Sequence, residues 1–199
     1  MEKETVTSAQ TSQDETHLIR RILDGQTALY RQLAGRYAVQ VLRMVARLIP
    51  SPEEAEEVTQ DALLEAYQSL ARYDAQKASF QTWLLRIAYH TALKHYRQHS
   101  KHVATVDMEQ QWLDAIPDAE ADALLDDTTA HRVALMEKAI DQLKPDDQML
   151  LNLFYFDNRS VRDIACITDH DEAYLYSRLQ WIRKKLAIII KTLESNEER

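Results

Sequence analysis

Glycine is almost absent from this chain, and its scarcity restricts the folds that the chain can adopt. Only Gly25 and Gly35 occur in 199 residues, and residues that favour helices dominate the composition. Apolar side chains recur at helical spacing in both halves of the sequence. We therefore predict an all-α protein made of two small helical domains.

The stretch from residue 53 to residue 97 begins with an acidic helix. Ser51 can cap this helix, Pro52 suits its first position and Glu54 completes a capping box. At 100° per residue, apolar and polar side chains fall on opposite faces. The core face contains Val58, Ala62 and Ala66, flanked by Leu63, Tyr67 and Leu70, and the opposite face contains Glu57, Gln60, Asp61, Leu64 and Gln68.

Leu64 is the unusual residue on the polar face of this helix. Solvent alone gives no reason for a leucine there, so a partner surface could explain it. Single exposed leucines are nevertheless normal, and acidic faces are often merely solvated. On this helix alone, a solvated face is the simpler interpretation.

A basic helix, predicted over residues 80–97, follows the short polar connection AQKAS. Between Asp74 and Asp107 the chain has no acidic residue, while Lys77, Arg86, Lys94, Arg97 and Lys101 all lie there. Cations neutralise phosphate and aromatic rings stack on exposed bases, so this run suits a nucleic-acid strand better than a solvated basic face. We expect Phe80, Trp83, Leu84, Ile87, Ala88 and Thr91 to face the core, and Arg86, Tyr89, His90, Leu93, Tyr96 and Arg97 to face outwards.

The sequence offers little that would support catalysis or a metal site. His95 and His99 are four residues apart, a spacing that can hold a metal ion, but no third ligand is evident. Cys166 is the sole cysteine, which excludes an internal disulfide and suits a reducing compartment. The polar N-terminus has no signal region, and no apolar run approaches the length of a membrane helix. We predict no metal, no cofactor, no enzymatic activity, no stable membrane insertion and a cytoplasmic location.

Three motifs lie in the acidic and basic helices: Glu54-Ala55-Glu56-Glu57-x-x-Gln60-Asp61, Leu64-x-Ala66-Tyr67 and Phe80-x-Thr82-Trp83-Leu84-x-Arg86-Ile87-Ala88. In this order they resemble region two of bacterial RNA polymerase sigma factors of the small extracytoplasmic-function type. The resemblance implies that the clamp helices of the core polymerase contact Glu57, Gln60, Asp61 and Leu64.

The resemblance also implies a promoter-binding surface in this domain. The loop over residues 72–79 and the helix after it would capture the melted minus-ten element. Two residues depart from the family pattern: His90 stands where Asn is usual, and Lys94 stands where Asp or another polar residue is common. The DNA-contacting residues implied in this domain are Lys77, Arg86, Tyr89, His90, Lys94 and Arg97.

An acidic segment separates the two predicted domains. Lysine and arginine are absent between Lys101 and Arg132, and the acids in that gap account for the net charge of −8 of the whole chain. The flanking domains are therefore close to neutral. The segment is either a self-repelling spacer or an acidic strand that imitates RNA inside the polymerase, and its Trp112 and Leu113 suggest docking. We predict a disordered tail over 1–14, domains over 15–102 and 131–199, and a linker over 103–130.

The second domain has the pattern of a helix-turn-helix. Val133, Met136, Ile140 and Leu143 form its first predicted stripe, and a second helix is predicted over residues 146–154. A short helix with a possible capping box at Ser160 follows, then a turn over residues 168–171 and a long helix from Glu172. A plain helical hairpin would give the same stripe. The inward residues of the long helix are predicted to be Leu175, Leu179, Ile182, Leu186 and Ile189.

The pattern runs from Leu143 through Asp163-Ile164-Ala165 to Arg178-Leu179 and Arg183-Lys184-Lys185-Leu186. In its place after region two, this domain resembles sigma region four, which binds the minus-thirty-five element. Asp169 stands in the turn where Gly is usual, and the front of the last helix is acidic. Aromatic side chains occupy positions where polar or basic residues are common, so either DNA contact or packing against a protein is open to them. The DNA-contacting residues implied here are Tyr174, Tyr176, Ser177, Arg178, Gln180, Trp181 and Lys184.

The whole pattern favours a sigma factor that binds core RNA polymerase and directs promoter recognition, melting and initiation. Its expected partners are core polymerase, promoter DNA and an anti-sigma factor. One alternative is an adaptor that binds polymerase or an anti-sigma protein without reading promoters, which the unusual last helix would suit. A helix-turn-helix repressor is a second alternative, but it leaves Leu64 and the acidic helix unexplained.

Overall fold

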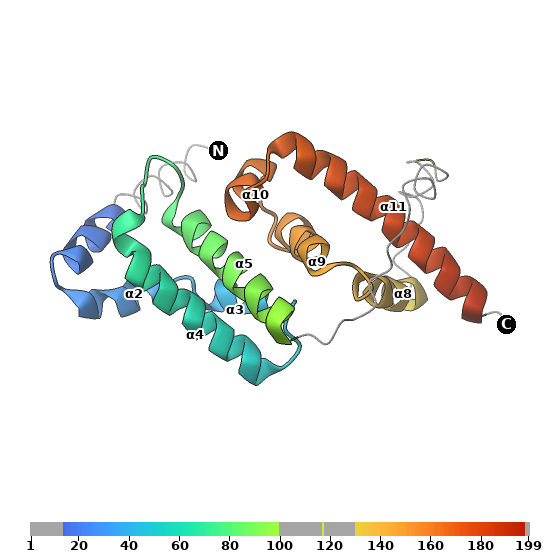
Figure 1. The fold of residues 1–199 in the computed structure, drawn as a ribbon, viewed down its shortest axis with the longest axis horizontal. Helices are drawn as coiled ribbons and strands as arrows, with labels where there is room; N and C mark the ends of the chain where they lie inside the picture. The colour runs from blue at the N-terminus through green and yellow to red at the C-terminus, as the bar shows by residue number, and fades with distance from the viewer. Residues whose placement is uncertain (1–13, 100–116, 118–129, 198–199) are drawn as a thin grey trace. The chain divides into compact units, whose positions relative to one another are not determined.

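The computed structural model describes residues 14–99, 117 and 130–197, and all regular structure in these residues is helical (Figure 1). Two compact units are present. The first contains the described residues up to Gln98 together with Arg162–Asp169, and the second contains those of His99–Val161 and His170–Arg199. The predicted tail and acidic linker lie almost entirely outside the described residues, as do Trp112 and Leu113.

The first unit opens with a helix over residues 14–23, followed by a short turn at Gly25. The sequence predicts one helix from Gln26 to about Leu48, and this prediction is wrong. Its stripe was expected to contain Leu29, Leu33, Tyr37, Val41, Met44 and Leu48. The chain instead forms η1 (Thr27–Leu29), α2 (Tyr30–Gly35) and α3 (Ala38–Ala46). Glycine is a poor helix former. After Gly35 the backbone makes a tighter turn, in which the Tyr37 amide donates a hydrogen bond to the Ala34 carbonyl at 3.0 Å.

Helix α4 (Pro52–Ser69) begins as the sequence predicts, because the Ser51 hydroxyl accepts a hydrogen bond from the Glu54 amide at 3.3 Å. Its predicted core face is confirmed: Val58, Ala62 and Ala66 are buried. Helix α3 packs against α4. The 3-10 turn η2 (Leu70–Arg72) then leads into the loop before the next helix.

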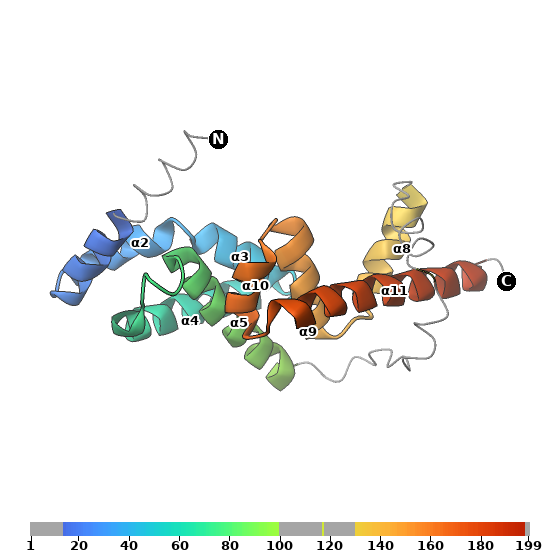
Figure 2. The ribbon, with the colours of Figure 1, turned by 90° about the horizontal axis from the view of Figure 1, so that it is seen from above.

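Helix α5 (Phe80–His99) follows this loop in the first unit (Figure 2). The Ser79 hydroxyl accepts from the Thr82 amide at 3.1 Å, which satisfies one of the free amides at the helix start. Buried Phe80 is surrounded by the rings of Tyr37, Tyr73 and Trp83, with centroid separations of 5.8, 5.6 and 5.7 Å. This aromatic cluster fixes the start of α5 against the rest of the unit.

The second unit consists of α8 (Ala130–Ile140), α9 (Pro145–Leu151), the π-helical turn η3 (Asn152–Phe156) and α11 (Glu172–Glu197). Helices α8 and α9 both pack against α11 (Figure 2). The stripe predicted for α11 is confirmed. Its buried residues include Leu175, Leu179, Ile182, Leu186 and Ile189.

The stripe predicted for α8 is partly wrong. Val133 is 47% exposed, whereas Leu135 and Ala139 are buried and line up with buried Leu143. The apolar residues of this helix surround most of it, so periodicity alone could not identify the face that meets α11.

The short helix α10 (Val161–Thr168) belongs by sequence to the second predicted domain, yet it is part of the first compact unit. After it, Asp169 adopts a left-handed backbone with φ of 61°. Glycine adopts that conformation without steric cost, and Asp is one of the few other residues that tolerate it. No helix among the described residues is both long and apolar enough to cross a bilayer.

Candidate functional site

The polar face of α4 presents one large apolar side chain among polar ones. Glu57, Gln60, Asp61 and Leu64 are all exposed, and their spacing places them on one side of the helix. Leu64 is 53% exposed. An apolar centre with a polar rim is the usual composition of a protein-binding patch.

Residues that flank the patch on α4 contact α2 and α5. The Tyr30 hydroxyl donates to the Leu63 carbonyl at 2.5 Å, and the Tyr30 ring lies 4.9 Å from the Tyr67 ring. Burial raises the pKa of Tyr30 to about 12. From α5, the Thr91 hydroxyl donates to Glu65 Oε2 at 3.0 Å. These bonds hold the Leu63 carbonyl against α2 and the Glu65 side chain against α5, on either side of Leu64.

Four basic side chains form an exposed stripe on α5, as the sequence predicts for them. Arg86, His90, Lys94 and Arg97 are exposed, and at 100° per residue they fall within a sector of about 80°. Lys77, in the loop before the helix, is exposed as well. We call Arg86, His90, Lys94 and Arg97 the basic stripe.

The outward orientation predicted for Tyr89 and Leu93 is wrong. Their side chains are 4% and 3% exposed. They follow buried Leu85 at helical spacing, so the buried sector of α5 extends further around the helix than a one-sided pattern predicts. Tyr89 therefore does not belong to the exposed surface of α5. Of the predicted core residues, Phe80, Leu84 and Ala88 are buried, and Trp83, Ile87 and Thr91 are half-buried.

A cavity of about 400 Å³ lies beside the start of α5. Three cationic side chains, Arg72, Lys77 and Arg86, line it together with the Trp83 ring. Two carboxylates, Asp74 and Asp169, line it as well. The cavity therefore combines a stacking surface with positive charge, a combination suited to a nucleotide.

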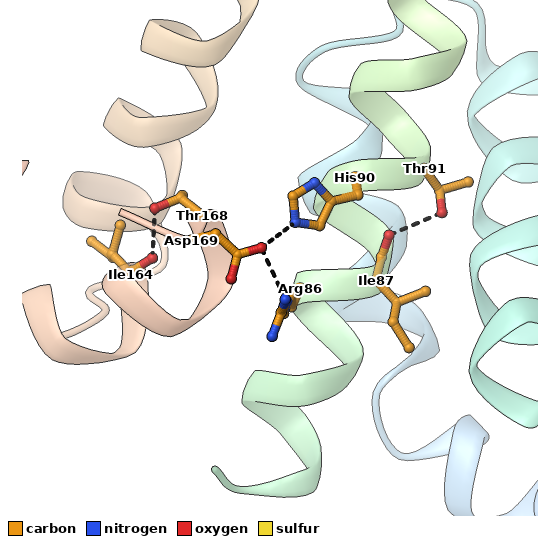
Figure 3. Close-up of polar contacts among 7 residues, drawn as sticks. All are labelled: Arg86, Ile87, His90, Thr91, Ile164, Thr168 and Asp169. Carbon is orange, nitrogen blue, oxygen red and sulfur yellow. Dashed lines mark hydrogen bonds and ion pairs between the residues drawn. The ribbon is translucent and has the colours of Figure 1, made fainter. Parts of the chain in front are cut away.

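Asp169 bonds two members of the basic stripe. Its Oδ2 atom lies 3.0 Å from Arg86 Nη2 and 3.1 Å from His90 Nε2 (Figure 3). All three side chains remain about half exposed. This contact was not predicted, because no sequence pattern links positions so far apart.

The residues predicted for DNA contact on α11 separate into two groups. Tyr174, Tyr176, Ser177 and Gln180 are exposed, and Tyr176 is 60% exposed. Trp181 and Lys184 are half-buried, and Arg178 is drawn into an ion pair with buried Asp147.

The acidic front of α11 has a structural role in the helix start. Asp171 Oδ1 accepts a hydrogen bond from the Tyr174 amide at 2.7 Å. A carboxylate at this point satisfies a free amide and interacts favourably with the helix dipole. The front of the helix therefore presents negative charge where a DNA reader often presents base-contacting side chains.

Comparison with known families identifies both units by sequence. The family described as Sigma-70 region 2 matches residues 33–102, and the family described as Sigma-70, region 4 matches residues 134–186. Together these matches span more than half of the chain. The chain therefore belongs to the sigma-70 family, and within it to the extracytoplasmic-function type, so it is a transcription initiation factor.

Similar proteins support the same assignment over most of the chain. The RNA polymerase sigma-H factor of Pseudomonas aeruginosa is 27% identical over 177 residues, covering 85% of this chain and 90% of that protein. The ECF RNA polymerase sigma-E factor of Escherichia coli is 27% identical over 169 residues, covering 81% and 86%.

Two solved structures share the fold. One is CnrH in complex with the cytosolic domain of CnrY, with a TM-score of 0.58, 17% identity and coverage of 88% of this chain and 96% of that one. The other is the sigma factor RpoE in complex with the anti-sigma factor NepR from Bartonella quintana, with a TM-score of 0.54, 17% identity and coverage of 81% and 96%.

Proposed function

We propose that the α4 face of Glu57, Gln60, Asp61 and Leu64 binds core RNA polymerase. The observation that carries this proposal is the exposure of Leu64, 53%, at the centre of a polar face on a firmly held helix. Burying such a side chain at an interface centre is favourable, and the surrounding polar groups select the partner.

The basic stripe and Lys77 hold the melted promoter strand in this proposal. In this role Arg86, Lys94 and Arg97 neutralise phosphates, and His90, which is exposed among them, reads a base edge. The Trp83 ring in the neighbouring cavity offers a stacking surface. Tyr89 has no part in it, because its side chain is buried.

The chain acts in this role by differential binding and not as an enzyme. A surface that binds single-stranded DNA better than duplex makes strand separation more favourable once polymerase has been recruited. Polymerase carries out the chemistry. A cytoplasmic location, where core polymerase and promoter DNA are present, is part of the same proposal.

An anti-sigma factor is a further expected partner. The similar structures were determined as complexes, one of them with the anti-sigma factor NepR. Such a partner would control access to the same binding surfaces. We expect the second unit to take part in promoter binding through exposed Tyr174, Tyr176, Ser177 and Gln180, with Lys184 at the edge of this surface.

Core-polymerase binding is the decisive test. Leu64→Ala and Asp61→Arg should each weaken the affinity for core polymerase, Leu64→Ala by about 1–2 kcal/mol, without changing the helical circular dichroism. Leu23→Ala is a matched control, because Leu23 is 51% exposed on another helix of the same unit. Undiminished affinity in both α4 variants would exclude this face.

An adaptor that binds polymerase without reading promoters is a second candidate. The observation in its favour is the front of α11, where Asp171 caps the helix and adds negative charge. Transcription from candidate promoters by core polymerase loaded with the chain separates the two functions. A sigma factor initiates from a subset of promoters, whereas an adaptor supports no initiation without another sigma factor.

A further inference from the structure

Helix α10 contacts one stripe of α5 through the acids near its two ends. Thr82, Arg86 and His90 are spaced four residues apart, so they form one line along α5. At one end of that line, the Thr82 hydroxyl donates to Asp163 Oδ1 at 3.3 Å. At the other, Asp169 bonds both Arg86 and His90. The same side chains that are proposed to face the promoter strand therefore face carboxylates.

A single oxygen of Asp169 serves both partners. Its Oδ2 atom is within hydrogen-bonding distance of Arg86 Nη2 and of His90 Nε2, as Figure 3 shows. A phosphate oxygen of a nucleic-acid strand would seek the same donors at similar distances. The carboxylate and a phosphate cannot occupy one position, so the two interactions exclude each other.

The backbone at Asp169 does not itself require a carboxylate. Its φ of 61° lies in the left-handed region, where glycine meets no steric cost. Glycine would complete the turn but could not bond α5.

We propose that Asp169 is an internal competitor for the promoter strand: its carboxylate takes the place of a phosphate on Arg86 and His90 while DNA is absent. The competition lowers the affinity of the free chain for single-stranded DNA and so limits promiscuous binding. It rests on the proposed strand-binding role of the basic stripe. Because all three side chains are about half exposed, the contact is weak enough for a strand to displace.

The test uses the full-length chain and a fluorescein-labelled single-stranded DNA of mixed sequence, with affinity measured by anisotropy. Asp169→Asn should raise the affinity about two- to fivefold at about 0.15 M salt, the range expected for an exposed ion pair. Asp169→Gly should raise it at least as much, and glycine suits the turn. Removing the Asp169 carboxylate should let Arg86 contact one more phosphate. The slope of log affinity against log salt concentration should then become steeper by about 0.7, the value for one contact on a single strand.

Two controls isolate the competition from a general loss of negative charge. Asp141→Asn removes the same charge from an exposed residue of α8's C-terminal turn, and it should change affinity less and leave the salt slope unaltered. In an Arg86→Gln, His90→Gln background, Asp169→Asn should no longer increase binding. A gain no larger than that of Asp141→Asn, or a gain that persists in that background, would overturn the proposal.

The proposed function is tested separately, in polymerase holoenzyme. If Arg86→Gln leaves open-complex formation unchanged there, the strand-binding role of the basic stripe fails. If it impairs open complexes while Asp169→Asn and Asp169→Gly leave strand binding by the free chain unchanged, only the competition fails. Circular dichroism of each variant checks that the fold is retained.

Discussion

Arg178 and Asp147 form a two-bond ion pair that joins α11 to α9. Arg178 Nε lies 2.7 Å from Asp147 Oδ1, and Arg178 Nη2 lies 2.8 Å from Asp147 Oδ2. Asp147 is 2% exposed, and the Arg178 guanidinium also stacks 3.9 Å from the Trp181 ring centroid. These contacts make Arg178 stabilise the packing of α11 against α9. They also leave Arg178 less available to bind a DNA phosphate.

We predict that Asp147→Asn destabilises the second unit, because it leaves the Arg178 charge without its buried counter-ion. The loss should approach the lower end of about 3–5 kcal/mol, since part of the Arg178 side chain is exposed. Hydrogen exchange of the α9 and α11 amides in the full-length chain measures it.

The matched control for that experiment is Arg162→Gln, which removes an exposed arginine and should leave exchange in α9 and α11 unchanged. A double variant, Asp147→Leu with Arg178→Met, should recover much of the lost protection, because apolar pairs often replace buried ion pairs without cost. Normal protection in Asp147→Asn would show that the pair contributes little.

Alkaline pH should destabilise the first unit through Tyr30. Burial raises its pKa from 10.0 to about 12, so the folded state favours the neutral phenol. The stabilisation is complete below pH 10 and is lost as the pH rises from 10 towards 12, because the unfolded chain ionises first. Tyr30→Phe should flatten the pH dependence of the unfolding midpoint in this interval.

Tyr67→Phe is the comparison for that measurement, since the two rings lie 4.9 Å apart in the same unit. Tyr30→Phe should also lower stability near neutral pH by about 1 kcal/mol, through loss of the bond to the Leu63 carbonyl. An unchanged slope between pH 10 and 12 would contradict the assignment to Tyr30.

Two aromatic residues of α11 should respond differently to a positive charge. Tyr176→Lys adds a cation at a side chain that is 60% exposed, so it should strengthen duplex DNA binding and steepen its salt dependence with little change in stability. Trp181→Arg should destabilise the unit, because the new charge would lie against Arg178 and buried Lys185, whose ammonium is 5.0 Å from the ring.

Thermal unfolding and duplex anisotropy, measured on both variants, check this contrast. Equal stability of the two proteins would mean that Trp181 tolerates the charge by moving outwards. A Tyr176→Lys variant without any gain in DNA affinity would place Tyr176 away from the DNA-facing surface.

Replacing His90 by Asn should change which base is preferred in the minus-ten element. His90 is exposed on the basic stripe. An Asn amide and a neutral imidazole each present one donor group and one acceptor, but they place these groups in different geometries. Open-complex formation by the holoenzyme on promoters varied at each minus-ten position measures the preference. An identical preference would show that position 90 does not read a base.

The sequence predicts the helices and most buried stripes because these depend on local spacing. Val58, Ala62 and Ala66 in α4 and Leu175 and Ile182 in α11 are buried as expected. Local spacing does not decide how wide a buried face is. Tyr89 is buried because the core extends further around α5 than a single stripe. The spacing of apolar residues along the helix does not show this width.

Breaks in helices were equally hard to predict. Gly35 was visible in the sequence, but a glycine within a helical pattern often continues the helix, so the end of α2 could not be assigned from it. The π-helical turn Asn152–Phe156, closed by Asp157 N bonding Asn152 O at 2.9 Å, has no sequence signature.

The candidate site was predictable where it consists of exposed side chains on one helix, as with Glu57, Gln60, Asp61 and Leu64. It was not predictable where side chains from distant segments meet. Asp147 with Arg178 and Asp169 with Arg86 are pairs of this kind. Each pair depends on the packing of separate helices, which a one-dimensional pattern does not contain.

Glu15 connects the helix over residues 14–23 to the rest of the first unit. These contacts limit how far the chain can be shortened from its N-terminus. Buried Glu15 accepts a hydrogen bond from the Tyr37 hydroxyl and lies 3.9 Å from the Arg36 guanidinium. Burial and the neighbouring carboxylate raise the pKa of Tyr37. A fragment that starts at Leu18 would leave the Tyr37 hydroxyl without this acceptor beside the Phe80 cluster. Proteolytic trimming past Glu15 should therefore loosen the start of α5, although the cut lies far from it in sequence.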